Sequence, residues 1–126
     1  MALVHHDLCF GCGQTNLFGL LLEVERVDAD HVAGRCFIKQ DHQGPDRRTA
    51  HQGVIAAALC EAMALGCGPE ARAVAFTVEL IADAPVGAFV EVEAATGDRR
   101  GNTIAATATA SSEQRPIATA RGRYEL

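Results

Sequence analysis

The stretch that decides the fold reads Thr49-Ala50-His51-Gln52-Gly53-Val54-Ile55-Ala56-Ala57-Ala58-Leu59-Cys60-Glu61-Ala62-Met63-Ala64-Leu65-Gly66. Between Gly53 and Gly66 it contains neither Gly nor Pro, and its many alanines favour a helix. Its residues are small or apolar on nearly every side, whereas a surface helix would carry a polar stripe. The sequence therefore predicts a buried central helix over residues 51–66, which other elements must wrap.

Segments with strand character lie on both sides of this helix. Before it, residues 20–27 and 31–38 are rich in Leu, Val and Phe, and the turn between them predicts a hairpin. After it, four segments alternate apolar and polar residues and are joined by short connections, which predicts an antiparallel meander; they are residues 73–80, 89–95, 103–110 and 117–124. A sheet curled around one apolar helix buries both, so we expect an α+β fold.

Length, charge and composition limit the class of protein. A chain of 126 residues makes one domain, residues 1–126. Its net charge of −5 and scattered basic residues argue against a nucleic-acid partner. It has no signal-peptide pattern and no apolar run of about 18 residues, so we expect a cytoplasmic protein without a membrane partner. Five cysteines without the spacing of a disulfide framework also indicate a reduced protein.

The N-terminal segment, residues 1–19, is rich in Cys and Gly. Cys9 and Cys12 form a Cys-x-x-Cys motif near His5 and His6, and thiolate and imidazole groups are zinc ligands. A structural zinc site needs four ligands, and no second pair follows this one in the sequence. We therefore expect no metal and no cofactor, with the cysteines packing under an edge of the sheet.

Four motifs run through the chain in the order found in one protein family. Cys9-Phe10-Gly11-Cys12-Gly13-Gln14-Thr15-Asn16-Leu17-Phe18-Gly19-Leu20 opens the chain, and His51-Gln52-Gly53 opens the helix. Phe76-Thr77-Val78-Glu79-Leu80 with Ala84-Pro85-Val86-Gly87 comes third, and Ala118-Thr119-Ala120-Arg121-Gly122 ends the series. Together they resemble hotdog-fold acyl-CoA thioesterases of the phenylacetate-pathway type, whose helix opens with His-Gly-Gly. The resemblance implies a single hotdog domain that forms a homodimer or homotetramer with active sites between subunits.

The resemblance also implies an enzyme, a hydrolase of acyl-CoA or acyl-carrier-protein thioesters. Gly53 matches the family glycine whose backbone N–H holds the oxyanion, and a helix N-terminus offers unpaired N–H groups and a positive dipole end. His51 matches the motif histidine, whose ring hydrogen-bonds the backbone and fixes the loop. Gln52 replaces a family glycine, and its side chain would narrow the approach of the thioester.

One departure from the family leaves the catalytic group open. The family's acid lies nine residues after the motif histidine, at the position that Cys60 occupies here. Glu61 is the only acid in the apolar helix and can act as base or nucleophile if the helix phasing is altered, because one residue turns an ideal helix by about 100°. Alternatively, Cys60 is the nucleophile. In the third reading, the protein binds an acyl thioester or another small apolar ligand without hydrolysing it.

Further residues are candidates for orienting the substrate. Gln43 matches an Asn or Gln that binds the thioester carbonyl or the attacking water in relatives, and Thr77 can supply a hydroxyl group. Guanidinium groups suit the phosphates of coenzyme A. The sequence does not rank the six arginine candidates, which are Arg47, Arg48, Arg99, Arg100, Arg121 and Arg123.

Overall fold

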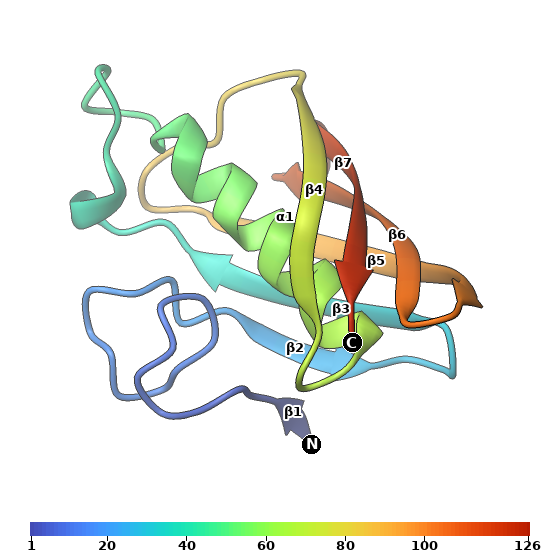
Figure 1. Cartoon of the computed structure of the whole chain (residues 1–126). Helices are drawn as coiled ribbons and strands as arrows, with labels where there is room; N and C mark the ends of the chain where they lie inside the picture. The colour runs from blue at the N-terminus through green and yellow to red at the C-terminus, as the bar shows by residue number, and fades with distance from the viewer.

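The computed structural model describes all 126 residues and consists of one α-helix wrapped by one antiparallel sheet (Figure 1). The helix is α1 (Gln52–Cys67), and a 3₁₀ helix, η1, spans Gln40–His42. The strands are β1 (Ala2–Leu3), β2 (Glu23–Arg26), β3 (His31–Phe37), β4 (Arg72–Leu80), β5 (Phe89–Arg100), β6 (Thr103–Ser112) and β7 (Arg115–Glu125). Their order in the sheet is β1-β2-β3-β5-β6-β7-β4. The predicted α+β architecture is confirmed.

Helix α1 crosses the concave face of the sheet and contacts strands β2 to β7 (Figure 1). It starts one residue after the predicted position, because His51 is its N-cap. It ends before Gly68, whose φ of 144° suits a residue without a side chain. Leu59 and Met63 are fully buried. With 16 residues, α1 is too short to cross a membrane, and no other helix is present that could.

The inner face of the sheet is lined by small side chains where it meets α1. Alternate residues of β5, β6 and β7 are buried alanines, namely Ala94, Ala106, Ala108, Ala110, Ala118 and Ala120. Small residues let the helix lie close to the strands, and larger buried side chains such as Tyr124 fill the rest of the core.

The predicted hairpin at residues 20–38 forms, but its first strand is shorter than expected. β2 pairs antiparallel with β3, and Val24 lies opposite Gly34. Residues 20–22 are not part of the strand, because the N–H groups of Leu20 and Leu22 donate to carbonyl oxygens of the N-terminal segment. The N-terminal segment thus takes the hydrogen bonds that would have lengthened the sheet.

The predicted meander of four strands is wrong in one member. β5, β6 and β7 are consecutive neighbours, but β4 pairs with β7 at the sheet edge rather than with β5. Because α1 crosses the sheet, the chain enters β4 at the far edge, and residues 81–88 carry it back to start β5 beside β3. The turns predicted at 97–102 and 111–116 are also shorter, since the strands continue to the two-residue turns Gly101-Asn102 and Glu113-Gln114.

Candidate active site at the helix N-terminus

Two loops meet the N-terminus of α1. The N–H of Ala50 donates to the oxygen of Ala84 at 2.9 Å, and the N–H of His51 donates to the oxygen of His42 at 2.7 Å. Gln43 forms a β-bridge with Ala50. The first contact fixes residues 81–88 against the start of the helix, and the other two fix the loop that contains η1. The structure therefore brings Gln43 close to the His51-Gln52-Gly53 motif.

The backbone N–H groups at this helix end differ in their availability. The N–H of Gly53 donates to Nδ1 of His51 at 2.8 Å, so the imidazole caps the helix. The N–H of Val54 donates to the oxygen of His51 at 2.9 Å. The N–H of Gln52, the first helical residue, makes no hydrogen bond. An unpaired N–H at the positive end of a helix can donate a hydrogen bond to a developing negative charge.

A pocket of about 200 Å³ opens beside this N–H group. Most of its lining residues are hydrophobic, polar atoms contribute a comparable share of the pocket surface, and Asp83 is the sole ionisable group in it; the lining residues are Ala50, Gln52, Ile55, Leu80, Ile81, Ala82, Asp83 and Ala84. Asp83 is exposed to solvent. Sequence reasoning missed Asp83, because only the contact between two distant loops places it beside the helix.

Cys60 lies two turns further along α1 and points toward the sheet. Its Sγ and its carbonyl oxygen both accept hydrogen bonds from the hydroxyl of Tyr124, at 3.3 Å and 2.9 Å. Burial raises the pKa of the Cys60 thiol above its ordinary value, and the hydrogen bond from Tyr124 opposes that shift. The thiol is therefore protonated at neutral pH, the unreactive form.

Glu61 lies on the opposite, outward side of α1, under the N-terminal segment. Its carboxylate contacts Nδ1 of His5 at 3.0 Å and Sγ of Cys9 at 3.2 Å. Eight residues separate it from Gly53, which corresponds to about 12 Å along the helix axis. Within one chain, Glu61 therefore does not meet the pocket at the helix N-terminus.

Solved structures with the same architecture were found for proteins of low sequence identity. The PaaI protein of the Escherichia coli phenylacetic acid degradation operon is 16% identical, with a TM-score of 0.76 over 85% of this chain and 84% of that one. Zebrafish thioesterase superfamily member 2 is 16% identical, with a TM-score of 0.76 over 89% and 86%. A hypothetical thioesterase of Streptococcus pneumoniae, crystallised with coenzyme A, is 10% identical, with a TM-score of 0.75 over 82% and 86%.

This chain has the hotdog fold that these structures share. No protein-family model matches it, and no curated protein matches it. At these identities the likeness establishes the fold, so substrate and mechanism must be argued from the site itself.

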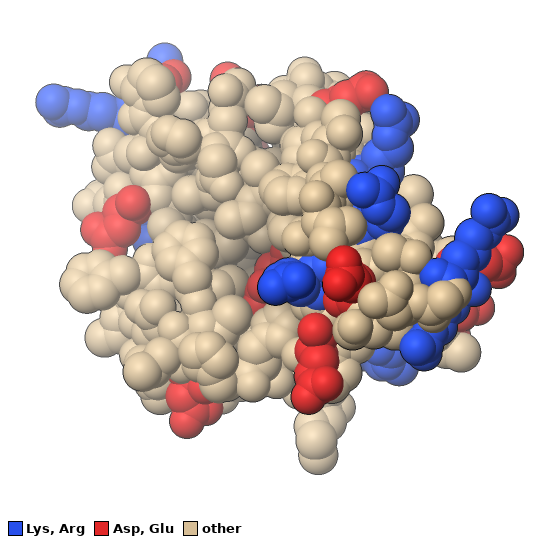
Figure 2. Space-filling view, in the orientation of Figure 1, with Lys and Arg blue, Asp and Glu red and all other residues tan.

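Thr77 and most of the arginine candidates lie away from the helix N-terminus of the hotdog domain. Thr77 pairs with Arg121 in register, on the face of the sheet opposite to the buried Ala120 and therefore to α1. Arg99 and Arg100 lie at the β5–β6 turn, at the other end of the molecule from the start of α1 (Figure 1). Charged side chains are scattered over the face in Figure 2 without a continuous basic stripe.

Arg47 and Arg48 lie in the loop that leads to the N-terminus of α1. The oxygen of Arg48 accepts a hydrogen bond from the N–H of Val86 at 2.8 Å, within the loop that carries Asp83. Both arginines are exposed, and Arg48 makes only a loose ion pair with Asp46 at 3.5 Å. The structure thus separates these two from the four other arginines that the sequence could not rank.

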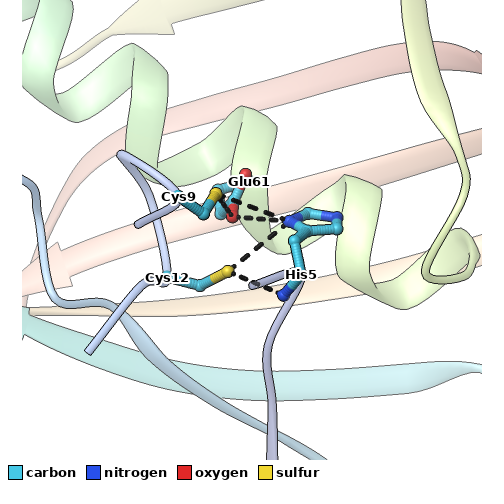
Figure 3. A group of neighbouring side chains, drawn as sticks. All are labelled: His5, Cys9, Cys12 and Glu61. Carbon is cyan, nitrogen blue, oxygen red and sulfur yellow. Dashed lines mark hydrogen bonds and ion pairs between the residues drawn. The ribbon is translucent and has the colours of Figure 1, made fainter. Parts of the chain in front are cut away.

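A second group of chemically active side chains lies around Glu61. His5, Cys9 and Cys12 of the N-terminal segment converge on its carboxylate (Figure 3). Burial and the neighbouring Glu61 raise the pKa of the Cys12 thiol to about 12. No second Cys/His pair for Cys9 and Cys12 is visible in the sequence, and their two partners in the structure are a nearby histidine, His5, and a carboxylate far along the chain, Glu61.

Proposed function

We propose that this hotdog protein is a thioesterase that hydrolyses an acyl-CoA or acyl-carrier-protein thioester at the N-terminus of α1. The observation that carries the proposal is the unpaired N–H of Gln52 at a pocket that combines hydrophobic side chains with one carboxylate, Asp83. The hydrophobic side chains suit an acyl group, and the N–H suits the thioester oxygen.

In this mechanism the backbone stabilises the oxyanion, and Asp83 acts first as general base and then as general acid. Water attacks the thioester carbon while the Asp83 carboxylate takes one of its protons. Negative charge develops on the carbonyl oxygen, which the N–H of Gln52 stabilises, joined by that of Gly53 once the His51 ring turns aside. The carbon–sulfur bond then breaks, the thiolate receives the proton held by Asp83, and the carboxylic acid product loses its own proton to solvent as it leaves with the free thiol.

Arg47 and Arg48 are the proposed contacts for the phosphates of the carrier. Coenzyme A and the phosphopantetheine arm of a carrier protein both present phosphate groups, and guanidinium groups bind phosphate oxygens in a fixed geometry. The coenzyme A bound to the S. pneumoniae neighbour supports this class of substrate. The five free cysteines agree with action in the cytoplasm, a reducing compartment.

We also propose that two chains associate through the free edge of β4. This strand of nine residues has no neighbour beyond β7, so one side of its backbone lacks strand partners. Phe76, Leu80 and Ile81 are 43%, 46% and 57% exposed at this edge. An exposed apolar edge strand is a template for pairing with a second copy.

Release of free thiol from short, medium and aryl acyl-CoAs tests the enzymatic proposal. We expect turnover by the purified chain and a loss of about 10²–10⁴-fold in kcat for Asp83→Asn, because a positioned base contributes that much. Asp46→Asn, in the other loop at the helix N-terminus, is the matched control. Turnover abolished by Glu61→Gln but retained by Asp83→Asn would instead assign the base to Glu61, in a site completed by a second subunit.

The second candidate function is binding of an acyl thioester without hydrolysis. The observation in its favour is that Cys60 is hydrogen-bonded to Tyr124 and Glu61 is engaged by the N-terminal segment. Saturable binding of acyl-CoA by the pure protein, with no thiol release from any member of the panel, would establish this alternative.

A further inference from the structure

Four potential metal ligands from two distant parts of the chain meet outside the pocket described above. His5, Cys9 and Cys12 come from the N-terminal segment, and Glu61 comes from the outward side of α1 (Figure 3). Each offers one ligand atom, and the four atoms lie within 4.8 Å of one another. His6 takes no part, since its Nδ1 accepts from the N–H of Leu8 at the surface.

The distances between these atoms are close to the edges of a tetrahedron around zinc. Zn²⁺ bonds of about 2.3 Å to sulfur and about 2.0–2.2 Å to nitrogen or oxygen place tetrahedral ligands about 3.3–3.8 Å apart. Nδ1 of His5 lies 3.7 Å from Sγ of Cys9, 3.5 Å from Sγ of Cys12 and 3.0 Å from Oε2 of Glu61. Sγ of Cys9 lies 3.2 Å from the same Oε2. Small movements outward would admit one ion at the centre.

The ligands are shielded from water and supported by the backbone around them. Cys12 is 1% exposed, and the side chains of His5 and Glu61 are 18% and 14% exposed. The backbone N–H of His5 donates to Sγ of Cys12 at 3.2 Å, the type of outer contact that stabilises a thiolate ligand. Gly11 packs so closely on Glu61 that a Cβ atom there would collide with its carboxylate. The backbone is thus shaped around the cluster.

The cluster contains acidic groups but no Lys or Arg side chain. As metal ligands, the two cysteines would be thiolates and would carry three negative charges together with the Glu61 carboxylate, which forms no ion pair with a Lys or Arg. A divalent ion supplies the missing positive charge and keeps both thiols deprotonated. Soft sulfur ligands with one imidazole and one carboxylate in a tetrahedron favour Zn²⁺ over Mg²⁺ and Ca²⁺, which prefer oxygen.

We propose that His5, Cys9, Cys12 and Glu61 bind one structural Zn²⁺ that fastens the N-terminal segment to α1. Four protein ligands leave no open position for substrate or water, which is typical of structural sites. Apart from the two-residue β1, residues 1–19 contain no helix or strand, and Leu8, Phe10, Leu17 and Phe18 are exposed. A metal cross-link compensates for that small core, and it removes Glu61 from the candidates for the catalytic base.

Metal content of the untagged full-length chain tests the proposal without any measurement of turnover. We expect about one Zn²⁺ per chain after purification under reducing conditions, and X-ray absorption of that sample with two sulfur and two nitrogen or oxygen neighbours. Cys9→Ser and Glu61→Gln should each weaken zinc affinity on the order of 100-fold. Cys67→Ser, a half-buried cysteine outside the cluster, should retain the metal.

Replacement of Zn²⁺ by Co²⁺ tests the site in the wild-type chain, so the result does not depend on whether the variants fold. Titration of the metal-free wild-type chain should give the intense visible bands of tetrahedral Co²⁺ and a thiolate charge-transfer band, both lost on addition of Zn²⁺. The proposal is overturned if the wild-type chain holds no more zinc than the Cys9→Ser/Cys12→Ser double variant. A Cys9–Cys12 disulfide in protein purified anaerobically, or a six-coordinate Co²⁺ spectrum, would also overturn it.

Discussion

At the residue scale, His51 affects two separate properties: the stability of α1 and access to the proposed oxyanion site. Its Nδ1 caps α1 through the N–H of Gly53, and its position beside Gln52 puts it at the edge of the proposed oxyanion site. Capping requires the ring to stay in place, whereas use of the Gly53 N–H by a substrate requires it to move. The same imidazole therefore links helix stability to access to the site.

Replacement of this cap tests which task dominates. His51→Ala should lower the free energy of unfolding by about 1 kcal/mol, the usual value of an N-cap. It should leave kcat within about threefold, because the freed N–H of Gly53 becomes available to the oxyanion. Urea denaturation and thiol-release kinetics measure the two effects. A fall in kcat of about 100-fold at unchanged stability would show instead that the imidazole acts on the substrate.

At the element scale, β4 is the part of the sheet whose position matters most. Val78 and Leu80 pair with the inward Ala120 and Ala118 of β7, and Phe76, two residues before Val78, shares their side of the sheet, the side of α1. Only Val78 is partly buried by its own chain, while Phe76 and Leu80 remain exposed. Leu80 also lines the pocket at the helix N-terminus, so the free edge and the proposed site adjoin each other.

A charge on this edge should separate the two subunits. We expect the wild-type chain to elute as a dimer or tetramer in light-scattering chromatography. Phe76→Lys should shift it to the monomer and reduce turnover, because a lysine in an apolar interface must be desolvated. Val27→Lys, an exposed apolar position far from β4, is the control. A wild-type monomer that hydrolyses thioesters at full rate would contradict both the dimer and its role.

At the scale of the whole molecule, His42 connects three segments that are distant in sequence. Its Nδ1 accepts from the N–H of Lys39 at 3.1 Å, its Nε2 donates to the oxygen of Gly19 at 3.3 Å, and its carbonyl accepts from His51. The side chain is 3% exposed. Burial lowers its pKa below the ordinary value, with Lys39 adding to the shift and Gly19 and Asp41 opposing it.

Stability should therefore fall in mild acid. Below the ordinary pKa of about 6.5 the unfolded chain binds a proton that folded His42 resists, so stability is retained above that pH and lost as pH falls toward the folded pKa. Urea unfolding between pH 7.5 and 5 should show this loss, and His42→Gln should show less of it. Equal slopes for the two proteins would assign the acid sensitivity to other groups, the cysteine ligands among them.

The central helix and the wrapping sheet could be predicted because both are local patterns. An apolar run of Ala and Leu has one way to bury all its sides, and alternation with period two marks each strand by itself. The sequence by itself therefore determined α1, the strand segments and the hotdog resemblance. The His51-Gln52-Gly53 motif was likewise visible, because its meaning depends only on its place at the helix start.

The tertiary structure alone decided which distant residues become neighbours. β4 lies beside β7 because α1 carries the chain across the sheet. Asp83 reaches the helix N-terminus through the pairing of Ala50 with Ala84, and Glu61 reaches His5 across 56 positions because the N-terminal segment folds back over α1. Sequence spacing does not predict such long-range contacts, since they depend on the path of the whole chain. For that reason the chemistry predicted at one helix divides into two sites, a pocket at its start and a ligand cluster on its outer side.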